Sequence, residues 1–170
     1  MTQSMEAPLF DDFAVVQGRS VAPPRPEAVR TFFATIGRKP PEAYVDLAAA
    51  HGGAYFDDDH AITPVSSAEG EIAIDFLFHF DPSIAAHGAA DRYAATRAVL
   101  PADLVPIASP RVNGEICLDY RTGGEPSVVL FDYDASPGQE VVAVADSFDA
   151  FIAALRPDAR PDLPPRAVSR

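Results

Sequence analysis

Four short runs of apolar, β-prone residues follow one another in the second half of the chain. They read LVPIAS (104–109), NGEICLDY (113–120), SVVLFDY (127–133) and VVAVA (141–145). Strands that recur about every ten residues are typical of an antiparallel meander, in which each strand pairs with the next. Gly123 and Gly124 can supply the positive φ angles of a hairpin turn between the second and third runs. An antiparallel sheet is therefore expected here.

Two helices are expected before this sheet. In PEAVRTFFATIGRK, four apolar residues recur at the spacing of one helical face, which predicts a helix over 26–36. Gly37 suits the position just after the end of that helix. A second helix over 41–51 can begin at Pro41 and end at Gly52 or Gly53 in the left-handed conformation.

Further elements complete the expected order. EIAIDFLFHF (71–80) alternates like a strand, ADRYAATRAVL (90–100) reads as a helix, and SFDAFIAAL (147–155) as a helix with Ser147 or Asp146 as its N-cap. The order predicts an α+β fold, with a mainly antiparallel sheet of about five to six strands and helices packed on one face. Residues 1–25 are expected to be an arm, 26–155 the domain, and 156–170 a flexible tail rich in Pro and Arg.

The charge distribution limits the kinds of partner. The formal net charge is −12, and residues 41–155 carry −15 between weakly basic ends. An acidic body repels phosphate backbones, which argues against nucleic-acid binding. It attracts a basic protein instead and speeds the encounter, although plain solubility is an alternative explanation of the same charge.

Targeting signals and cysteine chemistry add little. The first residues, MTQSMEAPLFDDF, lack the basic start of a signal peptide, and no run is apolar for long enough to span a membrane, so a cytoplasmic protein is expected. The single cysteine, Cys117, cannot form an intramolecular disulfide and is expected to be a small buried hydrophobe.

Three aspartates, Asp119, Asp132 and Asp134, lie in or just after two of the expected strands. If these strands pair, Asp119 and Asp132 could lie on the same side of the sheet. Two carboxylates at a suitable separation can serve glycoside hydrolysis, so a small carboxylate-dependent hydrolase is one hypothesis. The alternatives are that these residues cap turns and face solvent, or that they contact a partner.

A second acidic group, DDDH at 57–60, also admits several interpretations. Consecutive aspartates with a histidine could ligate a cation, but the stretch lacks the Gly and the terminal Glu of a calcium loop. A solvated acidic loop and an interface loop are the alternatives. No cofactor or metal site is assigned. The candidate partner-binding residues are Asp57, Asp58, Asp59, Asp75, Asp132 and Asp134. The scattered histidines, His51, His60, His79 and His87, are expected to have structural or surface roles.

Three segments resemble the SUKH superfamily in its Smi/Knr branch. They are PPEAYVDLAAAHGGAYF, LPADLVPIASPRVNGEICLDY and VVAVADSFDAFIAAL, which occur in the family's order. The chain departs from the usual pattern in having His51 before Gly-Gly and Asn113-Gly114 before the I-x-L-D strand.

The resemblance implies helices packed on a mainly antiparallel sheet. It also implies a non-enzymatic binding protein of the immunity type, which neutralises a cognate toxin, often a nuclease, from a polymorphic toxin system. From the acidic charge of the chain, we expect the partner to be a basic protein toxin whose active cleft an acidic surface occludes. Eukaryotic members imply a regulatory interaction scaffold as an alternative. No catalytic residues are implied; the residues implied to carry the fold are His51, Gly52, Gly53, Asn113, Gly114, Asp119, Phe148 and Phe151.

Overall fold

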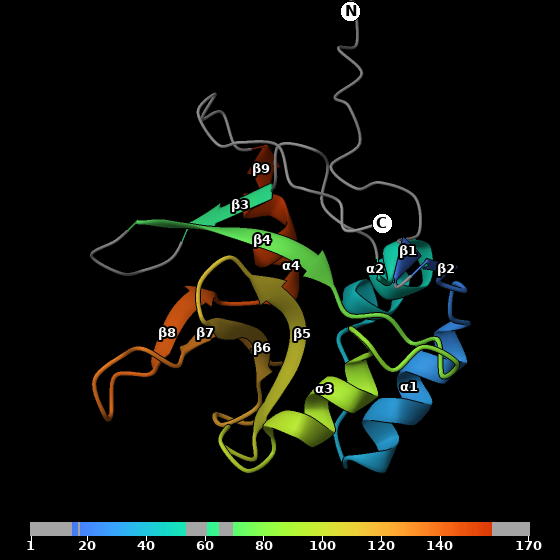
Figure 1. Ribbon diagram of the computed structural model, residues 1–170. Coiled ribbons are helices and arrows are strands. Elements are labelled where there is room, and N and C mark those ends of the chain that lie inside the picture. Colours follow the sequence, from blue (N-terminus) through green and yellow to red (C-terminus); the bar gives the residue numbers. More distant parts are fainter. Residues whose placement is uncertain (1–14, 17, 54–60, 65–69, 158–170) are drawn as a thin grey trace, which may run out of the picture.

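The computed structural model describes residues 15–16, 18–53, 61–64 and 70–157 (Figure 1). The helices are α1 (Pro26–Thr35), α2 (Glu42–His51), α3 (Ala89–Thr96) and α4 (Phe148–Ala154). The strands are β1 (Val15–Val16), β2 (Arg19–Ser20), β3 (Ala61–Pro64), β4 (Glu71–Leu77), β5 (Leu104–Pro110), β6 (Gly114–Asp119), β7 (Ser127–Asp132), β8 (Val141–Ala145) and β9 (Arg156–Pro157). The acidic stretch 57–60, with Asp57, Asp58, Asp59 and His60, lies outside the described residues.

The main sheet has seven strands in the order β8-β7-β6-β5-β4-β3-β9, and every neighbouring pair is antiparallel. The predicted meander is β5 to β8, with strand bounds within about two residues of the expected ones. The α+β fold with a mainly antiparallel sheet is thus confirmed. The strand count exceeds the expected five to six because β9, a two-residue strand that follows α4, joins β3 at one edge.

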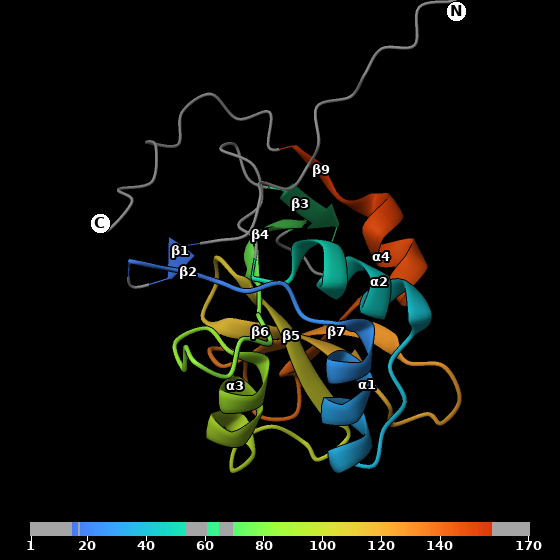
Figure 2. The ribbon, with the colours of Figure 1, turned by 90° about the vertical axis from the view of Figure 1, so that its right-hand side faces the viewer.

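Three helices cover one face of the sheet (Figures 1 and 2). Helices α1, α2 and α4 bury a chain of aromatic rings against it, in which Phe33 meets Tyr44 and Tyr44 meets Phe148 edge to face. Alternation in β6 supplies the opposing side chains, including Ile116 and Leu118, which are fully buried. This layer is the main hydrophobic core. Burial also raises the pKa of the Tyr44 phenol.

The opposite face of the sheet has a smaller core of its own. It consists of Leu100, Leu104, Cys117, Val129 and Phe131, with Tyr133 and Val141 packed against it. Cys117 has no solvent exposure, and this burial raises the pKa of its thiol. Among the described residues it is the one cysteine, and it is a small core side chain as expected.

Local sequence fixes where the helices end. Gly37 has φ +71°, and the two residues after the helix donate backbone hydrogen bonds back to it, Gly37 N–H to Ala34 O (3.1 Å) and Arg38 N–H to Phe33 O (2.9 Å). This pattern is the Schellman motif. Of the two glycines after α2, Gly53 takes the left-handed conformation, with φ +78°.

A serine side chain caps the start of α4. The Ser147 hydroxyl accepts a hydrogen bond from the Ala150 N–H at 3.1 Å, so Ser147, and not Asp146, is the N-cap.

The residues that precede α1 contact the loop between β4 and α3. Val16 and Val21 pack against Ile84, and the Arg19 guanidinium donates to the Ser83 carbonyl at 2.6 Å. Part of the segment expected to be an N-terminal arm therefore packs on the domain.

His79 organises that loop from within. It has no solvent exposure; its Nε2 lies 2.7 Å from the Ala86 carbonyl, and its Nδ1 accepts the Asp81 N–H at 3.1 Å. This pair of contacts defines a neutral ring with the proton on Nε2. The backbone of His79 is also bonded on both sides, to His87 and Ala89. The residue is structural, as expected of the scattered histidines.

Candidate partner-binding surface

The two carboxylates that could have formed a hydrolytic pair are far apart. Asp119 pairs with Ser127 beside the hairpin loop, whereas Asp132 pairs with Gly114 at the other end of the two strands. The rise along β6 between these positions is about 17 Å. Alternation also places them on opposite faces of the sheet. Asp119 shares a face with Cys117, two residues before it, whereas Asp132 pairs with Gly114, which shares a face with Ile116. The expectation that they share a side was wrong, and the paired-carboxylate arrangement does not exist.

Asp119 is instead held in a local structural contact. Its side chain is 6% exposed, and it accepts hydrogen bonds from the Arg121 N–H (2.9 Å) and from the Arg121 guanidinium (2.7 to 3.1 Å). Burial acts to raise its pKa, but the bonds from Arg121 outweigh burial and hold the pKa below the ordinary value. Asp119 thus fixes the start of the loop that joins β6 to β7.

Asp132 and Asp134 lie together at the turn that follows β7. The Asp132 carboxylate accepts the Asp134 N–H at 2.8 Å, and the Asp134 carboxylate accepts from the Asn113 amide at 3.0 Å. The Tyr133 N–H also donates to the Asn113 carbonyl at 2.9 Å. The turn is therefore ordered from within, and it presents the exposed Asp134 to solvent.

Asp75 differs from Asp132 and Asp134 in its surroundings. It lies in the middle of β4, is mostly buried, and pairs with Arg111 (Nε to Oδ1, 3.2 Å). Since a partner that approached Asp75 would meet Arg111 as well, this carboxylate contributes little net negative charge to the surface.

A longer acidic segment escaped the sequence analysis. Residues 122–155 contain six acids and no Lys, Arg or His. In the fold this segment forms β7, the edge strand β8, and α4, which contacts both of these strands. The acids are Glu125, Asp132, Asp134, Glu140, Asp146 and Asp149, of which only Asp132 and Glu140 are partly buried. The sequence alone could have shown this segment as the longest stretch without Lys, Arg or His. Only the sheet order shows that its strand β8 lies at an edge.

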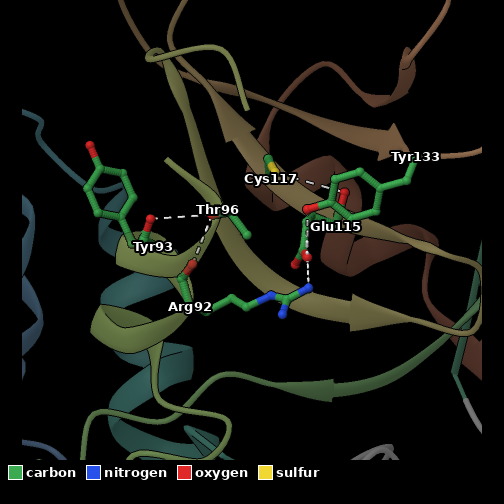
Figure 3. A network of polar contacts seen from close by, with 6 residues as sticks. All are labelled: Arg92, Tyr93, Thr96, Glu115, Cys117 and Tyr133. Carbon is green, nitrogen blue, oxygen red and sulfur yellow. Dashed lines mark hydrogen bonds and ion pairs between the residues drawn. The ribbon is translucent and has the colours of Figure 1, made fainter. Parts of the chain in front are cut away.

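A buried polar network links α3 to β6 (Figure 3). The side chain of Glu115 has no solvent exposure; its Oε1 accepts from the Arg92 guanidinium and from the Tyr133 hydroxyl, the latter at 3.1 Å. Burial and the neighbouring Glu115 raise the pKa of Tyr133 to about 12. Glu115 Oε2 and Arg92 Nε are buried and have no hydrogen-bond partner among the described residues. Arg92 and Glu115 lie in separate elements, so no sequence pattern indicated that they would meet.

The hollow beside α3 is too small to be a ligand site. Its volume is about 40 Å³, and its lining includes Tyr93, Thr96, Leu100 and Leu104. Small-molecule pockets are typically about 300–1,000 Å³.

The described part of the chain lacks a metal-binding cluster and a membrane-spanning helix. Within it, no three His, Cys, Asp or Glu side chains are grouped so that they could hold a metal ion. No helix in the same ranges is long and apolar enough to cross a membrane.

The family-motif residues occupy structurally demanding positions. A Cβ on Gly53 would lie 2.6 Å from the Cβ of His79, and one on Gly114 would collide with the Phe131 carbonyl of the paired strand. Phe148 and Phe151 are buried in the main core, where their rings lie 5.9 Å apart. The others lie at element ends: His51 and Gly52 at the end of α2, and Asn113 before β6.

Comparison with known proteins identifies the family. The model of the SMI1 / KNR4 family (SUKH-1) matches residues 23–154, which include all four helices and every strand of the sheet except β9. Comparison with the curated proteins gives no significant match. Since the family match covers well over half of the chain, the protein belongs to the SMI1 / KNR4 (SUKH-1) family.

Proposed function

We propose that this protein is an immunity protein, which binds a cognate toxin and neutralises it by covering a basic active cleft with an acidic surface. The observation that carries the proposal is the base-free segment 122–155, because it brings six acids and no base to β7, the edge strand β8, α4 and their connections. Membership of the SUKH-1 family is compatible with this role. We place the interaction in the cytoplasm, and we assign binding to the domain formed by residues 26–155.

Electrostatics explains why such a surface suits a toxin that acts on nucleic acid. A cleft that holds phosphates must carry Lys and Arg, and it therefore has the opposite charge to β7, β8 and α4. Complementary charge accelerates the encounter of two proteins and disfavours wrong partners. Asp134, Asp146 and Asp149 are exposed and supply this charge, and we include the acids of residues 57–59 as additional contacts.

The test is protection in a bacterial host that expresses the product of the neighbouring gene. The wild-type protein is expected to restore growth, and the purified pair to associate more slowly as salt is raised. The double variant Asp134→Asn/Asp149→Asn removes two exposed acids of segment 122–155 and is expected to slow association about threefold to tenfold.

The matched control is Glu27→Gln/Asp46→Asn, which removes two exposed acids from α1 and α2. It is expected to associate at the wild-type rate. Absence of protection by the wild-type protein would refute the immunity role, and recovery of regulatory proteins in place of a toxin would favour the interaction-scaffold function.

A further inference from the structure

Strand β8 is an edge of the main sheet with one side open. It pairs with β7, and no other strand of the described chain pairs with it (Figure 1). The Asp132 N–H donates to the Glu140 carbonyl at 2.7 Å, which makes these two residues a hydrogen-bonded pair of the antiparallel ladder. Such pairs alternate with pairs whose backbone groups point away from each other. In this register Val141 and Ala143 belong to the pairs that are not hydrogen-bonded, so their N–H and C=O groups point away from β7, toward the open side of β8.

The side chains of β8 do little to block that open side. The strand reads VVAVA, and Ala143 is exposed while the other four residues are partly buried. Edge strands usually carry a Lys, a Pro or an inward-pointing charge that prevents pairing with another chain, and β8 has none of these. The register shift between Val128 and Val129 affects only the far end of the strand and leaves 141–143 regular.

The charges around this edge define what can pair with it. Glu140 comes directly before β8 and Asp146 directly after it, and the nearest bases in the sequence are Arg121 and Arg156. Two copies of β8 placed edge to edge would bring like charges together at both ends, which disfavours self-association. An extended segment with Lys or Arg on both sides of an apolar or neutral centre would instead meet opposite charges.

We propose that the open edge of β8 binds an extended basic segment of the partner protein, which adds a strand to the sheet next to Val141 and Ala143. This inference rests on the proposed function in one respect, namely that the partner is a protein with a basic surface. Main-chain hydrogen bonds supply affinity in this mode of recognition, and the flanking charges supply selectivity.

The first experiment uses a synthetic peptide and does not require the toxin. The peptide KKVTVTVKK is added at millimolar concentration to the full chain, and binding is followed by NMR and by hydrogen exchange. The amides of Val141 and Ala143 are expected to shift and to exchange more slowly, because they become donors to the added strand. The peptide EEVTVTVEE, which has the same centre and opposite ends, is expected to bind at least about tenfold more weakly.

Two variants at one position separate pairing from side-chain effects. Ala143→Pro removes the outward N–H and leaves the bonds to β7 in place, since proline is tolerated on an edge strand where its nitrogen faces solvent. It is expected to weaken peptide binding at least about tenfold. Ala143→Thr keeps the N–H and suits a strand, so it is expected to bind within about twofold of wild type.

Each outcome has a defined meaning. A footprint of the KKVTVTVKK peptide away from β8, no binding at millimolar peptide, equal binding of the acidic peptide, or full binding by Ala143→Pro would each overturn the proposal. Dimerisation of the chain through β8 would overturn it as well. If the wild-type protein protects against the neighbouring gene product but the peptide leaves no footprint on β8, the immunity role stands and the edge proposal fails. If the peptide leaves its footprint on β8 but the wild-type protein does not protect, the edge proposal stands and the immunity role fails.

Discussion

Glu115 is the residue whose environment differs most from what its type suggests. It is a carboxylate at the second position of the interior strand β6, on a face that it shares with Cys117, and its side chain has no solvent exposure. Arg92 from α3 brings the positive charge that makes this position tolerable, and Tyr133 donates a hydroxyl (Figure 3). A buried charge costs much more free energy when its partner is removed than the intact pair contributes.

The first prediction concerns this pair. Arg92→Leu leaves the Glu115 carboxylate buried with only the Tyr133 hydroxyl, and it is expected to lower the free energy of unfolding by about 3 kcal/mol, at the lower end of the usual range because Arg92 is partly exposed. The double variant Arg92→Leu/Glu115→Met is expected to be more stable than Arg92→Leu alone. Urea unfolding measures both. A loss of less than about 1 kcal/mol in Arg92→Leu would show that the buried Glu115 carboxylate does not depend on Arg92.

Asp81 leads to a prediction about acid stability. It accepts hydrogen bonds from the Ala22 N–H (2.9 Å) and from the N–H and hydroxyl of Ser83 (2.9 and 2.7 Å), and these lower its pKa to about 2. Because the folded-state pKa is below the ordinary value, this contribution is complete above about pH 4 and is lost as pH falls through about 2.

Stability of the wild type and of Asp81→Asn, measured by denaturation at a series of pH values, tests this. The stability difference between them is expected to shrink between pH 4 and pH 2. A stability difference that stays constant through this range would show that those three donors do not stabilise the ionised form of Asp81.

At the scale of elements, the ends of α1 and α2 offer a matched pair of glycines. Gly37 and Gly53 both have positive φ after a helix, but only Gly53 is crowded, since a Cβ there would meet His79. Gly37→Ala is expected to cost about 1 kcal/mol from backbone conformation alone. Gly53→Ala adds the displacement of a buried histidine and is expected to cost at least about 1 kcal/mol more. Thermal or urea unfolding of the two variants measures the difference, and equal losses would contradict the crowding at Gly53.

The hairpin of β6 and β7 shows how far the sequence could predict such elements. Alternation within each strand was correct, because apolar side chains at every second position identify one buried face without reference to other strands. The sequence could not show whether Asp119 and Asp132 share a face of the sheet, because that depends on the register of the two strands. Gly123 and Gly124 do have positive φ, but they lie within a longer connection between the paired residues Asp119 and Ser127. The length of that connection, set by tertiary packing, decided which residues face each other.

At the scale of the whole molecule, charge was predictable from composition and its location was not. The sequence indicates an acidic body, but Asp119, Glu115 and Asp75 are each neutralised by an arginine from another position. That β8, which lies between Glu140 and Asp146, is an edge strand could be recognised only from the sheet order. The family, in contrast, follows from short motifs spread along the chain, whose relative order needs no three-dimensional information.

The net charge also predicts a salt effect on stability. With a formal net charge of −12, the folded chain repels itself more than the expanded chain does. The melting temperature is therefore expected to rise when NaCl is increased from about 10 mM to about 150 mM, where the screening length falls to about 8 Å. Differential scanning calorimetry measures this. A fall in melting temperature would mean that surface ion pairs such as Arg30–Glu42 outweigh the repulsion.

Both edges of the main sheet come from one short piece of chain. Residues 141–157 form β8 at one edge, then cross the sheet as α4, and then form β9 at the other edge. During synthesis from the N-terminus, β3 to β7 are made first, and β7 and β3 each lack their outer neighbour until this piece emerges. A nascent chain arrested before it would carry two unpaired strands. Such edges invite pairing with other chains, so the emerging protein is most vulnerable to aggregation just before its synthesis reaches β9.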